Sequence, residues 1–481
     1  MCRRSSSGRN AVPCALVLLL AGCGGGYSAS MGGGYMSPPM PKASVMFSSP
    51  ASASTIHQGQ AVKLAWTSSN ATSCSASTSS EIGGAFSGNQ PLSGSVTIAP
   101  VGPGTVTYTI SCMGSGGSGS ATTAAVTVQP SILSLLSPST LTTIGPTVDP
   151  IEHGLNPYGL AIAPVTAGLV TAGDLVVCNF NDGATNTQGD GTTIVGLHPA
   201  VGANPYRIAQ SASLEGCNAL AILADGSISA AAWTARQNPL VSPAGTVSTP
   251  FSADTFAGPW GEAYVAASGQ NPAALYVSNT DGSIDRITLS RDTQAADTQI
   301  VQGFCGSGMP GAIYAPAGLT YDASVDSLYV IDTSSYSVIA LANVSKIGAA
   351  GVVVAGQCSS TTSAPTPMPT FSGPSASSAS VIAHGAPLFA PLSAALLADG
   401  DLIVENSDIN IPSGQMPNLA VEVSPVLPGG FVGQPLQLDT SGVAGALFGI
   451  VATVDSQGNQ IIYFNDDSAT PNAVMRMTTA P

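Results

Sequence analysis

The stretch "APAGLTYDASVDSLYVIDTSSYSVIAL" (residues 315–341) alternates short apolar runs with polar turns. Runs this short, bounded by Asp, Ser and Thr, are typical of strands. Weaker copies recur along the chain, and each unit reads strand, turn, strand, turn, strand. Six units are predicted, 42 to 75 residues apart. Their matching positions are Gly159, Ala219, Gly261, Gly318, Ser393 and Gly449. This spacing is too long for a tight solenoid and suits propeller blades with variable loops.

The composition also favours strands. The chain has 481 residues, which suggests two or more domains. Charged residues make up 8%, while there are 55 Gly and 36 Pro, so helix formers are scarce and turn formers abundant. The mean hydropathy of +0.31 arises from small apolar residues, because after the N-terminus no run of 18 apolar residues is unbroken. An all-β protein without a membrane-spanning helix is predicted.

Residues 1–22 have the three parts of a secretory signal peptide: arginines, the run "AVPCALVLLLA" and a region of small residues. The end of this segment, Leu20–Cys23, resembles the bacterial lipobox. The resemblance implies cleavage before Cys23, lipid attachment to its thiol and a cell-envelope location. Because Gly24 follows, the outer membrane is expected. The alternative is an ordinary signal peptide with a chance cysteine.

Residues 23–44 have no apolar period and are predicted to be a flexible tether. After cleavage, 8 Lys and Arg stand against 26 Asp and Glu, a net charge of −18. Such a surface repels phosphate backbones, so nucleic acid is not expected as a partner. The expected partners are the membrane, through the lipid anchor, and a protein or carbohydrate ligand.

Residues 45–130 alternate apolar and polar residues in short runs, which indicates a half-buried antiparallel sandwich. Through "GQAVKLAWTSSNATSC" and "YTISC", this segment resembles bacterial Ig-like modules. A disulfide between Cys74 and Cys112 is then expected, because an envelope protein passes through an oxidising compartment. Trp66 precedes both cysteines, unlike the antibody order. The segment is interpreted as a spacer, with a ligand-binding sandwich as the alternative.

The six later units are similar to NHL-type repeats, in which a Pro-x-Gly start precedes an apolar strand, a turn and a second strand ending in Asp or Asn. The resemblance covers residues 150–478 and implies a six-bladed β-propeller, assigned to residues 131–481. In five units a short polar residue ends the second strand: Asn179, Asn279, Asp332, Asn406 and Asn465. These residues are interpreted as turn caps, with a metal ring as the alternative.

Three further features concern the loops and edges of this region. The last unit has three strands, so residues 139–148 are expected to pair with it as an outer strand. The preferred disulfides are Cys178 with Cys217 and Cys305 with Cys358, although four cysteines allow three pairings. The Ser/Pro-rich residues 359–386 are expected to be a disordered insertion, or else a lid.

A propeller would place a site at the mouth of its central channel. The residues just before the six anchor positions are expected there: Tyr158, Asn218, Trp260, Ala317, Leu392 and Phe448. This ring is aromatic and nearly uncharged, which favours a sugar or apolar ligand. The alternative is that the aromatic rings simply pack between blades.

Glu262 is the single acid expected on the inner strands near this mouth. Some propellers resemble gluconolactonase and use a channel metal, but this chain lacks their Glu-Gly-Pro motif, and only Glu262 and Asn218 could begin such a ligand set. No cofactor is therefore expected, with calcium as the weaker option. The sequence also has no G-x-S-x-G motif. The four histidines lie alone: His57, His153, His198 and His384.

Two functional hypotheses follow. The first is a non-catalytic envelope lipoprotein whose propeller is a binding scaffold displayed on an Ig-like spacer. The alternative is a propeller enzyme, a lactonase- or esterase-like hydrolase or a lyase, that acts on a small ester, lactone or sugar acid in the channel.

Overall fold

The computed structural model describes residues 38–136, 138–251, 256–290, 293–309, 312–356, 367–406, 411–427 and 429–479. Within these ranges nearly all regular structure is strand, and α1 (Ile132–Leu135) is the single α-helix. The all-β class is therefore confirmed. No helix of the described ranges has the length and apolar character needed to cross a bilayer.

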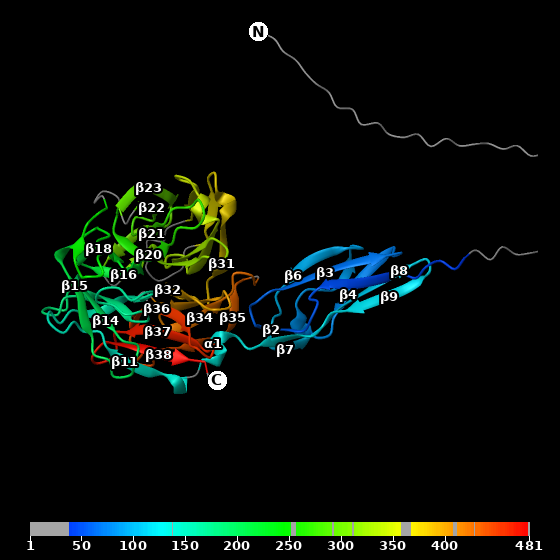
Figure 1. Ribbon diagram of the computed structural model, residues 1–481, viewed down its shortest axis with the longest axis horizontal. Coiled ribbons are helices and arrows are strands. Elements are labelled where there is room, and N and C mark those ends of the chain that lie inside the picture. Colours follow the sequence, from blue (N-terminus) through cyan, green and yellow to red (C-terminus); the bar gives the residue numbers. More distant parts are fainter. Residues whose placement is uncertain are drawn as a thin grey trace, which may run out of the picture.

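Residues 38–130, called the N-terminal region below, contain three small sheets (Figure 1). One sheet has the order β1 (Ser44–Ser49), β3 (Val62–Ser69), β6 (Gly94–Ile98). The next has the order β2 (Ser54–His57), β10 (Val126–Gln129), β7 (Gly104–Val106). The third has the order β5 (Gly88–Gln90), β4 (Ser73–Thr78), β8 (Tyr108–Gly114), β9 (Gly117–Thr122).

The three sheets share one apolar core. The ring of Phe86 lies 5.8 Å from the rings of Trp66 and of Tyr108, both edge to face. The predicted disulfide between Cys74 and Cys112 is confirmed. Its two cysteines lie directly opposite each other on β4 and β8, so the bond joins neighbouring strands of one sheet. This region is thus held by aromatic packing and a local covalent link.

The rest of the described chain forms six sheets of four or more strands, called the six-sheet region below. Figure 1 shows these sheets spread around a common centre. The first comprises β12 (Leu155–Ile162), β13 (Leu175–Asn181), β14 (Gln188–Leu197), β15 (Tyr206–Gln210). The second comprises β16 (Cys217–Ile222), β17 (Ile228–Ala232), β18 (Leu240–Val241), β19 (Val247–Ser248). The third comprises β20 (Pro259–Val265), β21 (Ala274–Asn279), β22 (Ile284–Ser290), β23 (Thr293–Gln302), β29 (Val352–Ala355), β30 (Thr370–Ser372).

The other three sheets follow the same plan. The fourth comprises β26 (Pro316–Asp322), β27 (Ser327–Asp332), β28 (Ser337–Ala342), β31 (Ala379–His384). The fifth comprises β32 (Pro391–Leu396), β33 (Leu402–Asn406), β34 (Leu419–Val423), β35 (Phe431–Gln437). The sixth comprises β36 (Leu447–Val454), β37 (Gln460–Asp466), β38 (Ala473–Thr478), β11 (Thr142–Pro146). A separate hairpin pairs β24 (Ser307–Met309) with β25 (Ala312–Tyr314).

Close backbone approach explains why glycine recurs at the anchor positions. Each first strand contacts the first strand of the next sheet, and β36 contacts β12. An added Cβ would lie 2.0 Å from the Ala317 oxygen at Gly261 and 2.3 Å from the Tyr158 oxygen at Gly449. Two other anchors meet the neighbouring strand in the same way, Gly159 and Gly318. The repeated glycine is therefore a steric requirement of strands crowded around a narrow centre.

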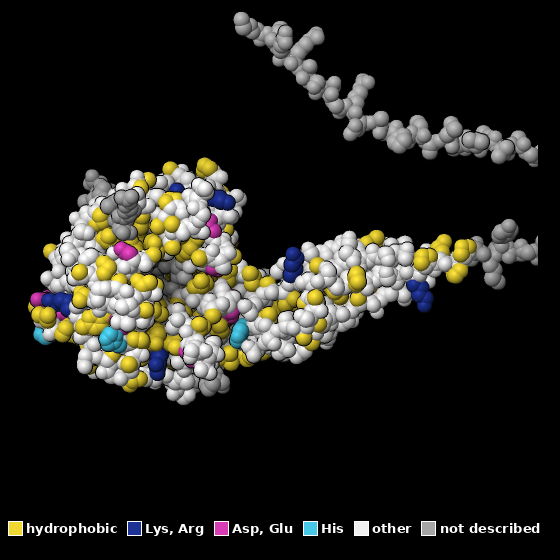
Figure 2. Space-filling model, viewed as in Figure 1, with side chains coloured by type: hydrophobic (Ala, Val, Ile, Leu, Met, Phe, Trp, Pro, Cys, Tyr) yellow, Lys and Arg dark blue, Asp and Glu magenta, His cyan; other side chains and the backbone are white. Residues whose placement is uncertain are grey.

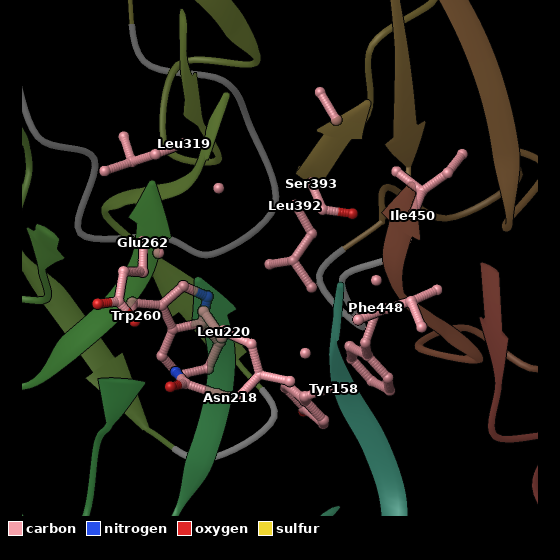
Figure 3. A pocket seen from close by; sticks show the side chains of 17 residues that line it. Tyr158, Asn218, Leu220, Trp260, Glu262, Leu319, Leu392, Ser393, Phe448 and Ile450 are labelled. Atoms are coloured by element: carbon pink, nitrogen blue, oxygen red, sulfur yellow. The ribbon is translucent and has the colours of Figure 1, made fainter. Parts of the chain in front are cut away.

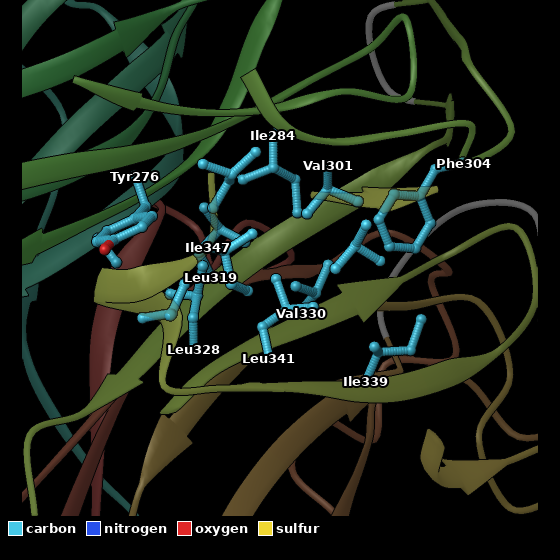
Figure 4. Close-up of a cluster of buried hydrophobic side chains, with 14 of the residues drawn as sticks. Tyr276, Ile284, Val301, Phe304, Leu319, Leu328, Val330, Ile339, Leu341 and Ile347 are labelled. Carbon is cyan, nitrogen blue, oxygen red and sulfur yellow. The ribbon is translucent and has the colours of Figure 1, made fainter. Parts of the chain in front are cut away.

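The apolar faces of neighbouring sheets pack against each other (Figure 4). Ile284 and Val301 of the third sheet pack against Leu328, Val330 and Leu341 of the fourth. Burial of each such side chain stabilises the fold by about 1.5–3 kcal/mol relative to exposure. A single sheet could not bury this face alone, which is why the units occur as a set.

The predicted pairing of residues 139–148 with the last unit is confirmed. β11 pairs antiparallel with β38, from Thr142 opposite Arg476 to Pro146 opposite Ala473. The sixth sheet therefore joins strands from the two ends of the six-sheet region, which covers the edge of β38.

The expectation of disorder for residues 359–386 is wrong for the part that the structure describes. β30 extends the third sheet through β29, and β31 is the outer strand of the fourth sheet. The short segment "ASVIAH" pairs with β28, whose edge would otherwise be open. The low complexity of the segment gave no sign of β31, because this strand is ordered by β28, which lies some forty residues earlier in the sequence.

Candidate functional site

A narrow cavity lies where the six first strands meet, and all six contribute to its wall (Figure 3). Its volume is about 90 Å³, enough for a few water molecules and far below that of a drug-sized ligand site. The structure brings the candidate residues together here: Tyr158, Asn218, Trp260, Glu262, Leu392 and Phe448. Ala317 is buried in the adjoining apolar cluster.

The aromatic side chains stack on one another. The Tyr158 ring lies 3.8 Å from the Phe448 ring and 4.2 Å from the Phe180 ring, both stacked, and Trp260 meets it edge-on at 6.0 Å. All four are buried. Because both faces of Tyr158 are covered, these rings pack as the alternative interpretation proposed and offer no open stacking platform to a sugar.

Glu262 lies on β20 and is only 6% exposed. Its Oε1 accepts a hydrogen bond from Asn238 Nδ2 at 2.9 Å, whereas Oε2 has no hydrogen-bond partner among the described residues. Burial raises the pKa of Glu262 to about 8, and the side chains of Ser229 and Asn238 offset this only in part. The carboxyl is therefore mostly neutral at pH 7 and can donate a proton.

Asn218 is the second residue of β16, the first strand of the second sheet, and is also 6% exposed. Neither its Nδ2 nor its Oδ1 has a hydrogen-bond partner among the described residues. Asn218 and Glu262 line the same cavity. Two neighbouring buried side chains thus have unused hydrogen-bonding capacity at one place, which is costly unless water or a ligand occupies it.

A second buried acid was missed by the sequence analysis. Glu405 lies on β33, the second strand of the fifth sheet, and is fully buried. Its Oε2 accepts a hydrogen bond from the hydroxyl of Ser393, a residue of the cavity wall. Burial raises the pKa of Glu405 to about 8. Acids were expected at the channel only on first strands, yet a Glu inside the apolar run "LIVEN" was a usable signal.

The polar residues that end the second strands bond local groups. Asn279 Nδ2 donates to Asp285 at 2.7 Å, and Asp332 accepts from the Ser334 hydroxyl at 2.7 Å. Asn406 Nδ2 donates to the Pro387 oxygen at 2.6 Å. Asn179 Nδ2 donates to the Thr193 hydroxyl, and Asn465 Nδ2 donates to the backbone oxygen of Tyr158. Capping of turns and neighbouring strands accounts for this recurrence.

The predicted disulfide between Cys178 and Cys217 is confirmed. Cys305 is disulfide-bonded, and its predicted partner Cys358 lies outside the described residues, as does the lipidation candidate Cys23.

The histidines lie in four separate places and none lines the cavity. His198 Nδ1 lies 2.6 Å from Asp174 Oδ1, and His384 Nδ1 lies 3.1 Å from the Ser337 hydroxyl. His57 Nδ1 lies 3.0 Å from the Pro130 oxygen, and His153 has a positive φ of 60°. Among the described residues, Glu262 therefore has no histidine beside it in the cavity.

No family model matches this chain, and no curated protein does. Several solved structures resemble it in fold. Virginiamycin B lyase from Staphylococcus aureus is 13% identical, with a TM-score of 0.39 over 71% of this chain and 99% of that one. A gluconolactonase from Xanthomonas campestris is 12% identical, with a TM-score of 0.42 over 68% and 87%. A Bacteroides thetaiotaomicron protein of unknown function is 10% identical, with a TM-score of 0.40 over 92% and 98%. These neighbours are β-propeller proteins, and the likeness concerns the fold only.

Proposed function

We propose that residues 131–481 form a six-bladed propeller whose central cavity is an active site for a small neutral molecule, with Glu262 as the proton donor. The radial order of the six first strands supports the propeller. In this proposal the N-terminal region is an Ig-like spacer, and a lipid on Cys23 anchors the chain to the outer membrane. On the face seen in Figure 2, basic side chains lie in isolated patches, which suits a partner other than nucleic acid.

One observation carries the proposal: Asn218 and Glu262 line one cavity with three buried polar atoms that have no hydrogen-bond partner among the described residues. An unmade hydrogen bond of a buried group costs about 1–3 kcal/mol. A purely structural interior would pair or replace these groups. A carbonyl or hydroxyl of a bound molecule would satisfy the carboxyl and the amide together.

The protonation of Glu262 favours catalysis over passive binding. A carboxylic acid with a pKa near the working pH serves well as a general acid. Glu262 would donate its proton to the departing oxygen of an ester or lactone, and water would add to the carbonyl carbon and return a proton to the carboxylate. Asn218 would orient the carbonyl oxygen through its amide N–H. For these reasons we prefer the enzyme, which was the alternative from the sequence, to the non-catalytic scaffold that the sequence favoured.

The non-catalytic scaffold is the second candidate. The small cavity volume of about 90 Å³ and the stacked aromatic rings favour it, because a bulky substrate would have to displace buried side chains.

A panel of acetyl esters and of γ- and δ-lactones, assayed with purified protein, tests the proposal. Glu262→Gln keeps the shape and removes the proton, so turnover should fall about 100-fold or more. Asp285→Asn is the matched control, since this buried acid, with a pKa raised to about 7, does not line the cavity. Equal turnover by wild type and Glu262→Gln would reject Glu262 as the proton donor, and no turnover of any substrate would favour the scaffold.

The proposed lipid attachment at Cys23 has its own test. Cells fed radiolabelled palmitate should label the wild-type chain and leave Cys23→Ser unlabelled. Label on Cys23→Ser would reject Cys23 as the attachment site.

A further inference from the structure

The N-terminal region and the six-sheet region meet at a group of three acids. The Asp399 and Asp401 side chains come from the turn between β32 and β33, and Glu422 comes from β34. One carboxylate oxygen of each lies within 4.8 Å of the others. Asp401 is 2% exposed and Glu422 is fully buried. Asp399 is half-buried. Crowding three carboxylates together, two of them away from water, is unfavourable unless protons or a cation neutralise them.

The described surroundings compensate this charge only in part. Burial raises the pKa of all three acids and outweighs the groups that favour their ionised forms, among them His57 for Asp399, and the side chains of Ser424 and Ser131 for Asp401 and Glu422, respectively. Glu422 accepts hydrogen bonds from the backbone N–H groups of Ile132 and Leu133, at 3.3 and 2.6 Å. Asp399 Oδ2 and Asp401 Oδ2 are buried without a hydrogen-bond partner among the described residues. The ion pairs found among the described residues lie elsewhere, on Asp149, Glu152 and Asp174, so none of them neutralises the cluster.

The N-terminal region covers this cluster closely. Gln60 Nε2 donates to the Asp399 backbone oxygen at 3.1 Å, and the Ser424 hydroxyl donates to the Gly59 oxygen at 2.8 Å. An added Cβ on Gly59 would lie 2.2 Å from Asp401 Oδ2. In Figure 1, β2 and β7 face the side of the six-sheet region that carries α1 and β35. Asp399 and Asp401 also line a cavity of about 480 Å³ between the two regions.

We infer that Asp399, Asp401 and Glu422 form a binding site for one divalent cation, calcium by its donor set, that locks the N-terminal region onto the six-sheet region. Carboxylate oxygens are the ligands of hard cations, and calcium accepts the mixture of carboxylate, carbonyl and water ligands that this junction offers. The two unpartnered aspartate oxygens point to the missing ligand independently of the clustering. The site is distinct from the turn caps and from the central cavity.

The wild-type chain alone provides the first test. Full-length protein freed of metal with EDTA is titrated with CaCl₂ by isothermal calorimetry and melted with and without calcium. One ion per chain should bind with a dissociation constant of about 1 mM or lower, and saturation should raise Tm by several degrees. No binding up to about 10 mM, in protein that still melts cooperatively, would overturn the inference.

Variants then locate the ion. Asp401→Asn and Glu422→Gln should each weaken calcium binding at least about 10-fold. The matched control is Asp322→Asn, because Asp322 lines the same cavity outside the cluster. In EDTA, Asp401→Asn should melt no lower than wild type, since it removes repulsion. Unchanged calcium binding by Asp401→Asn, or equal loss in Asp322→Asn, would contradict this site.

Discussion

The two regions of this protein handle charge in opposite ways. Residues 38–130 contain one acid, the exposed Glu81, whereas the other 25 of the 26 Asp and Glu residues lie in residues 131–481. The N-terminal core consists mainly of apolar and aromatic side chains and a disulfide. The six-sheet region buries carboxyls at its centre and at its junction, including Glu262 and Asp401. The described part of the first interior thus buries no carboxyl, while the second carries buried acids whose cost calls for a functional reason.

The largest expected effect concerns the crowded centre of the six-sheet region. Gly261→Ala places a Cβ 2.0 Å from the Ala317 backbone oxygen, so the free energy of unfolding should fall by about 4 kcal/mol or more. Gly348→Ala is the matched control, since nothing lies within 4 Å of its added Cβ and its φ is not positive. Urea unfolding measures both variants. If Gly261→Ala were as stable as Gly348→Ala, the steric explanation of the repeated glycines would be wrong.

The next largest effect is expected from removing the disulfides, which should destabilise the two regions to different extents. Replacing Cys74 and Cys112 by alanine opens a loop of 38 residues and should cost about 2–4 kcal/mol. The comparison pair, Cys178 and Cys217, closes a loop of similar length, 39 residues. Because the N-terminal region has the smaller core, its calorimetric transition should drop further than that of the six-sheet region. If each variant shifted the transitions of both regions equally, the two regions would unfold as one unit.

Solution pH should affect only the region with buried acids. Below pH 4.5 Glu262 is protonated in both states, and between about 4.5 and 8 it has ionised only in the unfolded state. Glu262 should therefore contribute a fall of about 1.4 kcal/mol per pH unit in the free energy of unfolding over this window, in addition to the slope from other buried acids such as Glu405. Glu262→Gln should remove this one-proton slope, as measured by urea unfolding at pH 5 to 8. An unchanged slope would mean that Glu262 is ionised in the folded protein.

The smallest effect is expected for the turn caps. Asn465→Ala loses the hydrogen bond to the Tyr158 oxygen, 3.1 Å long, and should cost about 1 kcal/mol. Calcium binding should not change, because Asn465 lies outside the acid cluster. Calorimetric titration of this variant checks the point, and loss of calcium would revive the metal-ring alternative.

Much of the fold could be predicted from local patterns. The strand units, the recurring glycines and the outer strand near residues 139–148 are all visible as short apolar runs and turns. Strand β31 was missed because its composition resembles a disordered loop, and only its pairing with β28 orders it. Local periodicity encodes secondary structure, whereas pairing depends on a partner elsewhere in the chain.

The candidate site was predicted in outline only. The positions before the anchor residues do converge, because equivalent places in repeated units meet at one centre. Which groups there lack partners could not be read from the sequence: Glu262 and Glu405 both lie in apolar strands, yet one reaches the cavity directly and the other through Ser393. The pairing of a polar atom depends on every neighbour that packs around it.

By itself the sequence determined the all-β class and the repeated unit, because these depend on composition and on the order of residues along the chain. It only suggested the two described disulfide pairs, which the structure then decided. Only the tertiary structure decided which acids are buried and which of them stand together. Asp401 and Glu422 are separated by 21 positions, and Gly59, which covers them, lies more than 300 positions away. Burial and charge repulsion act through space, so their consequences for pKa and for cation binding appear only once the chain has folded.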